Sequence, residues 1–299
     1  MKQRRIAILG GSGFVGSRLA ALLAADDESV VVLTRRLQRA HDLEVLHRIE
    51  PREVDAQNPT ALAAALADID VMINLVGVLN EHGGDASFQR AHVTLTEKVL
   101  GACREAGVRR YLHMSSLNAG EQKGKSIYLR TKGEAEQRVR ENDAELDWTI
   151  FRPSVIFGEG DDFFNRFGQL VRVLPVFPLA MPDARLQPVF VDDVVGCMID
   201  AIDDAATHGK AICLCGPDIF TLREIVEYTA RTVGVSRKVI GLPDWAARLQ
   251  ARTMEFVPGK PFSIDNYESL KTDSICPDDC PPQATSVDTV VPQYLGRRN

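Results

Sequence analysis

Residues 5–16 read Arg5-Ile6-Ala7-Ile8-Leu9-Gly10-Gly11-Ser12-Gly13-Phe14-Val15-Gly16. A short apolar run is followed by a cluster of glycines, and residues 14–25 then carry apolar side chains at helical spacing. This order predicts a strand, a tight turn and a helix. Such a beginning is typical of α/β proteins, so we expect strands and helices to alternate in the segments that follow.

The glycines of this turn fit two related motifs. Gly10, Gly13 and Gly16 give G-x-x-G-x-x-G, whereas Gly11, Gly13 and Gly16 give G-x-G-x-x-G. In both, the glycines let the backbone approach a pyrophosphate, and the helix N-terminus supplies N–H groups. The flanking strand and helix favour dinucleotide binding over a purely structural turn. The predicted phosphate-binding residues are Gly10, Gly11, Ser12, Gly13, Phe14, Val15 and Gly16.

Strand and helix patterns alternate through the first half of the chain. Continuous apolar runs, typical of buried parallel strands, predict strands at residues 29–34, 70–76, 109–114 and 147–152. Helical spacing predicts helices at residues 59–66, 88–106 and 128–140. The alternation predicts an α/β fold with a Rossmann-type, doubly wound parallel sheet. We assign residues 1–160 to this dinucleotide-binding domain.

Prolines interrupt the pattern after residue 153. We assign residues 161–299 mostly to a small, substrate-facing C-terminal α/β lobe and tail, with residues 186–203 returning to the Rossmann sheet. The later elements are predicted as strands at residues 189–191 and 210–215 and helices at residues 192–202 and 221–233. Glu224 has capping-box spacing in the last helix. Residues 277–299, rich in Pro, Asp and Thr, are predicted to be an irregular tail.

Composition limits the classes of protein to consider. The chain has 299 residues, of which 45% are hydrophobic, enough for one large α/β domain with an appendage. Its formal net charge of −6 argues against nucleic-acid binding, which needs a basic surface. No apolar run is long enough to span a membrane. Glycines and Arg18 interrupt the N-terminal apolar run, which argues against a secretion signal, so we predict a cytoplasmic protein.

The cysteines are scattered, at positions 103, 197, 213, 215, 276 and 280. A chain of this size does not need disulfides to stabilise its core, so we expect reduced thiols. Cys276 and Cys280 lie close in sequence, but no second Cys or His pair follows them, and no metal site is predicted. Cys213 and Cys215 are expected to be small, buried apolar side chains.

The end of the second predicted strand indicates which dinucleotide binds. An NAD-binding domain places an acidic residue there for the adenine ribose, but this chain has Thr34, Arg35 and Arg36, and no acid between residues 30 and 41. A guanidinium can pair with a 2′-phosphate, whereas a carboxylate repels it. The sequence therefore favours NADP(H) over NAD(H). The alternative is that these arginines are only a solvated basic surface.

A second motif carries groups suited to acid/base chemistry. Tyr128 and Lys132 form Y-x-x-x-K in a predicted helix, and this spacing places the phenol and the ammonium on one helix face. The positive charge favours the phenolate, so Tyr128 is a candidate general acid/base. Ser115 and Ser116 follow a strand that ends at Met114, at the sheet edge where ligands bind. One of these hydroxyls is expected to hydrogen-bond a substrate carbonyl or alcohol.

With these motifs in this order, residues 4–245 resemble the extended or atypical branch of the short-chain dehydrogenase/reductase superfamily. Two further segments support the resemblance: a strand end similar to the family's N-A-A-G and a turn similar to its R-P turn. The resemblance implies that Lys132 lowers the pKa of Tyr128 and binds the nicotinamide ribose, while Ser115 or Ser116 orients the substrate. Ser116 has the better spacing to Tyr128, although Leu117 stands where extended members usually place the hydroxyl. The implied additional cofactor contacts are Asn74, Leu75, Val76, Gly77, Met114, Arg152, Pro153 and Ser154.

Within the superfamily, residues 128–132, 148–158 and 294–296 are similar to a group that contains the nucleotide-binding accessory subunit of respiratory complex I and its bacterial relatives. This resemblance implies NADP(H) binding, a quinone-related substrate and peripheral association with a complex at the inner membrane. It also implies a second role, because the respiratory subunit is regarded as a structural nucleotide holder.

We therefore expect an NADP(H)-dependent oxidoreductase that acts on a carbonyl or alcohol of an apolar small molecule. The alternative is a non-catalytic NADP(H)-binding scaffold of a respiratory or quinone-synthesis complex. A sugar-nucleotide epimerase is disfavoured, because residues 170–181 are apolar. Residues 245–257 mix large apolar side chains with Arg248 and Arg252, which fits an apolar substrate cavity or a membrane contact. Because so short a basic amphipathic pattern is a weak membrane signal, a lid packed onto the sheet is favoured. The oligomeric state stays open.

Overall fold

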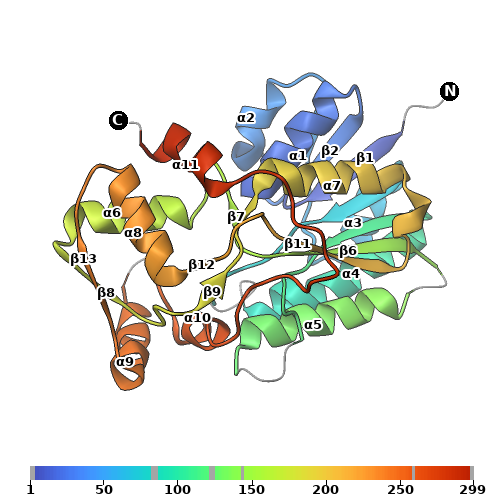
Figure 1. Cartoon of the computed structure of the whole chain (residues 1–299). Helices are drawn as coiled ribbons and strands as arrows, with labels where there is room; N and C mark the ends of the chain where they lie inside the picture. Colours follow the sequence, from blue (N-terminus) through green and yellow to red (C-terminus); the bar gives the residue numbers. More distant parts are fainter. Residues whose placement is uncertain (1–3, 82–86, 121–124, 143–144, 258–259, 297–299) are drawn as a thin grey trace. The chain divides into compact units, whose positions relative to one another are not determined.

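The computed structural model describes residues 4–81, 87–120, 125–142, 145–257 and 260–296 (Figure 1). The chain divides into two compact units. The first consists of residues 1–120, 131–152 and 195–212, and the second of residues 121–130, 153–194 and 213–299. Each unit is therefore assembled from three separate stretches of the chain.

A seven-stranded sheet forms the centre of the first unit, in the order β11-β6-β5-β4-β1-β2-β3. Its strands are β1 (Arg5–Leu9), β2 (Ser29–Thr34), β3 (Ile49–Glu53), β4 (Val71–Asn74), β5 (Arg110–Met114), β6 (Asp147–Pro153) and β11 (Lys210–Leu214). All pairings from β3 to β6 are parallel. The strand order reverses between β1 and β4, which confirms the predicted doubly wound Rossmann-type sheet.

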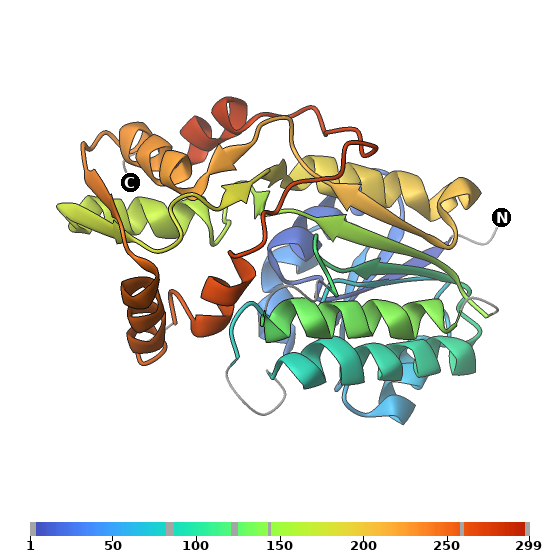
Figure 2. The same cartoon turned by 60° about the horizontal axis from the view of Figure 1, so that its bottom comes forward.

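Helices cover both faces of this sheet. They are α1 (Phe14–Ala25), α2 (His41–Glu44), α3 (Pro59–Ala65), α4 (Leu95–Ala106), α5 (Ile127–Arg140) and α7 (Val191–Asp203), with short helical turns η1 (Leu37–Ala40) and η4 (Ala205–Thr207) and a π-helical segment η3 (Gln89–Thr94). Leu62 of α3, Val99 of α4 and Val139 of α5 share a core with Leu9 and Leu33 of the sheet. In Figures 1 and 2, α4 and α5 run side by side under this face, and Figure 1 shows α1 and α7 on the other.

Two strands of this sheet differ from the sequence prediction. β11 forms the edge of the large sheet, next to β6, whereas its sequence pattern was compatible with a strand of the separate lobe. β3 has no counterpart among the predicted strands, because Glu50, Pro51 and Arg52 hide its extended character. An edge strand accommodates charged side chains and a proline, since one of its sides is not hydrogen-bonded within the sheet.

The second unit contains short strand pairs and a helical core. The strands are β7 (Ile156–Phe157), paired with β10 (Val189–Phe190), β9 (Arg185–Leu186), paired with β12 (Phe220–Thr221), and β8 (Val176–Leu179), paired with β13 (Lys238–Gly241). The helices are α6 (Phe164–Val173), α8 (Leu222–Thr232), α9 (Asp244–Met254), α10 (Ile264–Ser269) and α11 (Val287–Leu295). The capping box predicted at Glu224 is confirmed, with Thr221 as the N-cap of α8.

The prediction of an irregular tail over residues 277–299 is wrong for α11. Pro292, which lies in the middle of this helix, is a residue that normally interrupts helices. However, Val287, Val291 and Leu295 recur at helical spacing and are buried in the core of the second unit. The Tyr294 hydroxyl also donates a hydrogen bond of 2.6 Å to Asp161. Burial of this apolar face therefore outweighs the hydrogen bond that proline removes.

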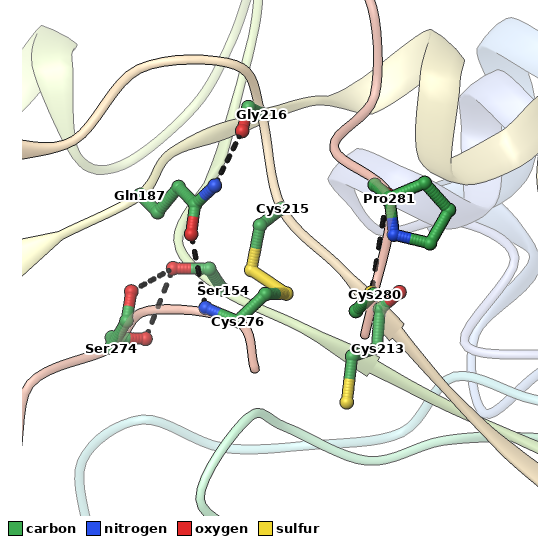
Figure 3. The surroundings of a disulfide bond; sticks show 9 residues. All are labelled: Ser154, Gln187, Cys213, Cys215, Gly216, Ser274, Cys276, Cys280 and Pro281. Atoms are coloured by element: carbon green, nitrogen blue, oxygen red, sulfur yellow. Dashed lines mark hydrogen bonds between the residues drawn. A yellow bond between two sulfur atoms is a disulfide. The ribbon is translucent and has the colours of Figure 1, made fainter. Parts of the chain in front are cut away.

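The expectation that all cysteines are reduced is wrong for one pair, since Cys215 and Cys276 form a disulfide (Figure 3). The Gln187 side chain supports the bond by donating to the Gly216 carbonyl (2.8 Å) and accepting from the Cys276 N–H (3.0 Å). The neighbouring Cys280 thiol donates to the Cys213 carbonyl instead. A pairing across 61 residues leaves no local pattern in the sequence.

This disulfide gives a testable prediction of stability. We expect Cys276→Ser to lower the free energy of unfolding by about 2–4 kcal/mol, because the bond restricts the unfolded chain across 61 residues. Urea denaturation of the full chain measures the effect. Cys280→Ser is the matched control, since serine keeps a hydroxyl that can donate to the same carbonyl. Equal midpoints for the Cys276 variant and the oxidised parent protein would contradict the prediction.

Candidate functional site

The glycine turn between β1 and α1 requires glycine at two places, for the backbone conformation at Gly10 and for space at Gly16. Gly10 has φ +89°, a left-handed conformation that favours glycine. A Cβ on Gly16 would lie 2.2 Å from the Gly10 carbonyl oxygen. The Gly13 N–H donates to that same oxygen (3.0 Å) and closes the turn. No side chain caps the N-terminus of α1, and its first turn holds no acid, so its N–H groups can receive an anionic group.

The order of the strands brings most of the predicted site residues to one edge of the sheet. β5, β4, β1 and β2 are consecutive neighbours, and their carboxyl ends lead into Ser115, Asn74, Gly10 and Arg35. The glycine turn touches the end of β4, because a Cβ on Gly10 would lie 3.3 Å from the Val76 nitrogen. In open α/β sheets, ligands bind at the carboxyl edge where the strand order reverses.

Arg35 and Arg36 are exposed directly after β2. The Thr34 hydroxyl donates to the Arg36 carbonyl (3.0 Å) and accepts from the Arg36 N–H (3.3 Å), which fixes the turn that carries them. Among the described residues, neither guanidinium pairs with a carboxylate. Both are therefore available to an anion at this edge of the sheet.

Lys132 lies buried beneath the ends of β4 and β5. Its ammonium donates a hydrogen bond of 3.0 Å to the Met114 carbonyl. It also approaches the backbone at Gly77, where a Cβ would lie 3.0 Å from the Lys132 Nζ. Burial lowers the pKa of Lys132 to about 8, and Glu136 partly opposes this shift. A buried lysine with such a pKa can change its protonation state close to neutral pH.

His92, which has no recognisable sequence motif, joins two parts of this site. It lies in η3, and π-helical segments of this kind are frequent at functional sites. Its Nε2 accepts from the Val78 N–H (3.1 Å), and its Nδ1 lies 2.9 Å from the Thr131 hydroxyl. Burial, followed by the charge of Lys132, lowers the pKa of His92 to about 2. The neutral imidazole therefore connects the loop after β4 to the helix that carries Lys132.

Buried polar atoms without partners gather at the end of β5. The His113 Nδ1 lies 3.1 Å from the Tyr111 hydroxyl, which accepts from Asn74 (3.2 Å). Burial and the charge of Lys132 lower the pKa of His113 to about 3. In the described part of the chain, the His113 Nε2 and the hydroxyls of Ser115 and Ser116 have no hydrogen-bond partner. Buried polar atoms normally have one, so this position fits a polar ligand or ordered water.

Tyr128 lies half-buried in the first turn of α5, one turn before Lys132 on the same helix. Asp265 of α10 holds this turn. Its carboxylate accepts from the backbone N–H groups of Ile127 (2.6 Å) and Tyr128 (3.3 Å) and from the Ser126 hydroxyl (3.0 Å). A negative charge at a helix N-terminus is stabilising. Asp265 therefore fixes the segment that carries the predicted acid/base, although no sequence motif connects the two residues.

Two other predicted cofactor contacts, Arg152 and Ser154, instead form side-chain interactions with other residues of the protein. The Arg152 guanidinium pairs with Glu136, a buried carboxylate of α5, at 2.8 Å. The Ser154 hydroxyl lies 3.0 Å from both the carbonyl and the hydroxyl of Ser274.

In the described ranges, no group of three His, Cys, Asp or Glu side chains is placed to hold a metal ion. No described helix combines the length and apolar character needed to cross a membrane.

Two similarities extend over most of the chain. Subunit 9 of the mitochondrial NADH dehydrogenase [ubiquinone] 1 alpha subcomplex of Arabidopsis thaliana is 29% identical over 290 residues, which are 91% of this chain and 70% of that protein. A ceramide reductase of Caulobacter vibrioides is 29% identical over 243 residues, covering 80% of this chain and 74% of the reductase. The resemblance to this accessory subunit and to short-chain reductases is therefore confirmed.

The fold is also similar to that of a solved enzyme. The dTDP-glucose 4,6-dehydratase DesIV of Streptomyces venezuelae, crystallised with NAD, has a TM-score of 0.75 and 18% identity over 97% of this chain and 95% of that structure. This likeness confirms the fold class. A family model described as NAD(P)H-binding matches residues 10–162, which include the glycine turn and the helix of Tyr128 and Lys132. The chain therefore belongs to the NAD(P)H-binding family, with the fold of the extended short-chain dehydrogenases and reductases.

Proposed function

We propose that this protein is an NADP(H)-dependent oxidoreductase that interconverts a carbonyl and an alcohol on an apolar small molecule. The observation that carries the proposal is the group of buried, unpartnered polar atoms around Lys132. The hydroxyls of Ser115 and Ser116 and the His113 Nε2 are desolvated at the sheet edge where ligands bind. A substrate oxygen can provide the hydrogen-bond partner that they lack.

The residues present fit a dinucleotide with a 2′-phosphate. The glycine turn, from Gly10 to Gly16, would receive the pyrophosphate, because its backbone can approach closely and α1 offers its N–H groups. Arg35 and Arg36 would pair with the 2′-phosphate. Asn74, Leu75, Val76 and Gly77 end the neighbouring strand and would line the path toward Lys132. When bound, the cofactor supplies or accepts the hydride.

The chain's own residues would manage the proton and hold the substrate. In the reducing direction, the Tyr128 hydroxyl donates its proton to the substrate oxygen as the carbonyl carbon gains hydride. The Lys132 ammonium stabilises the phenolate that remains, one helical turn away. A hydroxyl from Ser115 or Ser116 donates a hydrogen bond to the same oxygen. The oxidising direction uses the same groups in reverse.

The relatives support an apolar substrate. A ceramide reductase and a 2-alkyl-3-oxoalkanoate reductase of Stenotrophomonas maltophilia are named for substrates with alkyl chains. The Arabidopsis relative is named as a subunit of a mitochondrial NADH dehydrogenase [ubiquinone]. We therefore propose a substrate with an apolar chain or a quinone-related ring. NADPH oxidation in the presence of detergent-solubilised alkyl ketones, long-chain oxoacyl compounds and quinones tests this class.

A second function is favoured by the accessory-subunit relatives alone. In this alternative, the protein is a cytoplasmic NADP(H)-binding scaffold that associates peripherally with a respiratory or quinone-synthesis complex at the inner membrane. Affinity purification of the native protein separates the two functions. Stable recovery with such a complex, combined with absence of turnover across the substrate panel, supports the scaffold. Turnover that depends on Tyr128 supports the enzyme.

The cofactor preference makes a direct prediction. We expect the double variant Arg35→Ala, Arg36→Ala to bind NADPH roughly tenfold to a hundredfold more weakly, because a hydrogen bond to a charged group contributes about 1.5–3 kcal/mol. NADH affinity should not change. Isothermal titration calorimetry measures both. Arg39→Ala is the control, since Arg39 is exposed nearby but is not at the strand end. If Arg39→Ala weakens NADPH binding equally, the effect comes from general surface charge and not from contact with the 2′-phosphate.

A further inference from the structure

We propose that α9 and the turn after it form a docking surface for an anionic phospholipid bilayer. The surface, called the α9 face below, comprises Trp245, Arg248, Leu249, Arg252 and Phe256. This inference concerns the second unit and does not depend on the proposed catalytic chemistry.

The apolar side chains of the α9 face point away from the core of their own unit. The exposed fractions are 71% for Trp245, 56% for Leu249 and 88% for Phe256. The fully buried side chains of the helix are Ala247 and Ala251, which contact a small core. The large apolar side chains that were predicted to pack as a lid are therefore exposed. Large apolar side chains that gather, exposed, on one helix face can mark an interaction surface.

Both arginines of α9 are exposed, and both acids of the segment accept hydrogen bonds from other parts of the second unit. Arg248 and Arg252 are exposed one turn apart, and among the described residues neither pairs with a carboxylate. The two acids of the same segment, Asp244 and Glu255, lie one turn from these arginines, and each accepts a hydrogen bond from another residue. Asp244 accepts from the Tyr267 hydroxyl, and Glu255 accepts from the Ile264 N–H (2.9 Å). The exposed side therefore combines cations with aromatic rings, although the whole chain carries a net charge of −6.

The apolar surface continues from α9 onto the adjoining strand pair. The Gln250 side chain donates to the Pro178 carbonyl (3.0 Å), which holds α9 against β8. On β8 and its partner β13, Val176 and Ile240 are each 43% exposed, and the exposed Lys238 is the register partner of Val176. Figures 1 and 2 show α9 next to this strand pair. The same mixture of apolar and basic side chains thus spans two elements.

This composition fits a bilayer surface better than the other occupants. At the membrane interface, aromatic rings enter the headgroup region while arginines pair with lipid phosphates. A second copy of this chain would place four arginines in one interface to which the α9 face contributes no acid. A small anion would account for the arginines but not for the exposed aromatic rings. Negatively charged phospholipids satisfy both groups at once.

The experiment uses the full chain and vesicles of phosphatidylcholine, with and without phosphatidylglycerol. Cosedimentation gives the affinity, and the emission of Trp245 reports insertion, because Trp148, the other tryptophan, is buried. We expect binding to the anionic vesicles, a shift of the Trp245 emission to shorter wavelength, and weaker binding as salt is raised. Binding to both vesicle types with equal affinity would overturn the role assigned to the arginines.

Two double variants and a control separate the contributions. Arg248→Gln, Arg252→Gln is expected to weaken binding to anionic vesicles by roughly thirtyfold, at about 1 kcal/mol for each basic side chain near the surface. Trp245→Ala, Phe256→Ser is expected to weaken it by about tenfold or more, since apolar area is no longer buried. Val45→Ser, at a side chain that is 81% exposed in the first unit, should bind like the parent protein.

The same variants show whether the molecule is intact. NADPH affinity should be unchanged in all of them, which separates loss of membrane binding from loss of folding or of the proposed function. Vesicle affinities that do not respond to either double variant would overturn the proposal. A second result would also overturn it. If the parent protein does not bind vesicles but forms a dimer, and Trp245→Ala dissociates that dimer, the α9 face binds a second copy of the chain.

Discussion

Tyr128→Phe is expected to lower kcat by about 10²- to 10⁴-fold, the usual contribution of a general acid/base. Phenylalanine keeps the ring and the fold of α5 but cannot donate a proton to the substrate oxygen. NADPH affinity should be unchanged, because the glycine turn and the arginines after β2 are untouched. Steady-state kinetics on the substrate identified by the screen, together with calorimetry, measures the two quantities separately.

A matched control is available within the same chain. Tyr294→Phe also removes one hydroxyl, which donates to Asp161 in the second unit. We expect it to lower the free energy of unfolding by about 1.5–3 kcal/mol, because the lost hydrogen bond is to a carboxylate, and to leave kcat unchanged. If Tyr128→Phe retains full turnover, the proposed acid/base role is wrong. Absence of turnover in the parent protein on every substrate favours the scaffold.

Gly16→Ala is expected to abolish measurable binding of both NADPH and NADH. The new methyl carbon would lie 2.2 Å from the Gly10 carbonyl oxygen and 2.6 Å from the Gly11 Cα. Both are backbone atoms, so the turn must open and the N–H groups of α1 lose their arrangement. Calorimetry measures the binding, and urea denaturation establishes that the variant remains folded.

Gly196→Ala in α7 is the control for this prediction. A Cβ there meets no atom within 4 Å, and alanine favours a helix over glycine. We therefore expect unchanged or slightly higher stability and unchanged cofactor binding. Normal NADPH affinity in Gly16→Ala would show that the nucleotide is held elsewhere and would remove the basis of the proposed cofactor site.

The parts of the fold that were predictable are those whose residues repeat a local pattern. β1, β2, β4, β5 and β6 are apolar runs buried between helices, and the glycine turn combines tight spacing with a fixed position after a strand. β3 was not predictable, because an exposed edge strand carries charged residues. α11 was not predictable either, since its helix is stabilised by burial against α6 and α8, which outweighs the effect of Pro292.

The residues of the candidate site also differ in whether a local sequence pattern predicts them. Tyr128 and Lys132 are predicted by their spacing on one helix, and Ser115 by its place after a strand. His92 and Asp265 act through contacts with residues far away in sequence, the first with Thr131 and the second with the start of α5. No local pattern reports such contacts. Glu136 could have been found, because it follows Lys132 at helical spacing and partly opposes the fall in its pKa.

The position of β11 beside β6 has a consequence for the growing chain. β6 ends at Pro153, and the strand that covers its outer edge begins only at Lys210. During translation, β6 therefore emerges well before its neighbour, with Trp148, Ile150 and Phe151 among its apolar side chains. Until β11 leaves the ribosome, the backbone of β6 can pair with another nascent polypeptide. The interval between synthesis of these two strands is thus the time in which the outer edge of β6 lacks its partner in the sheet.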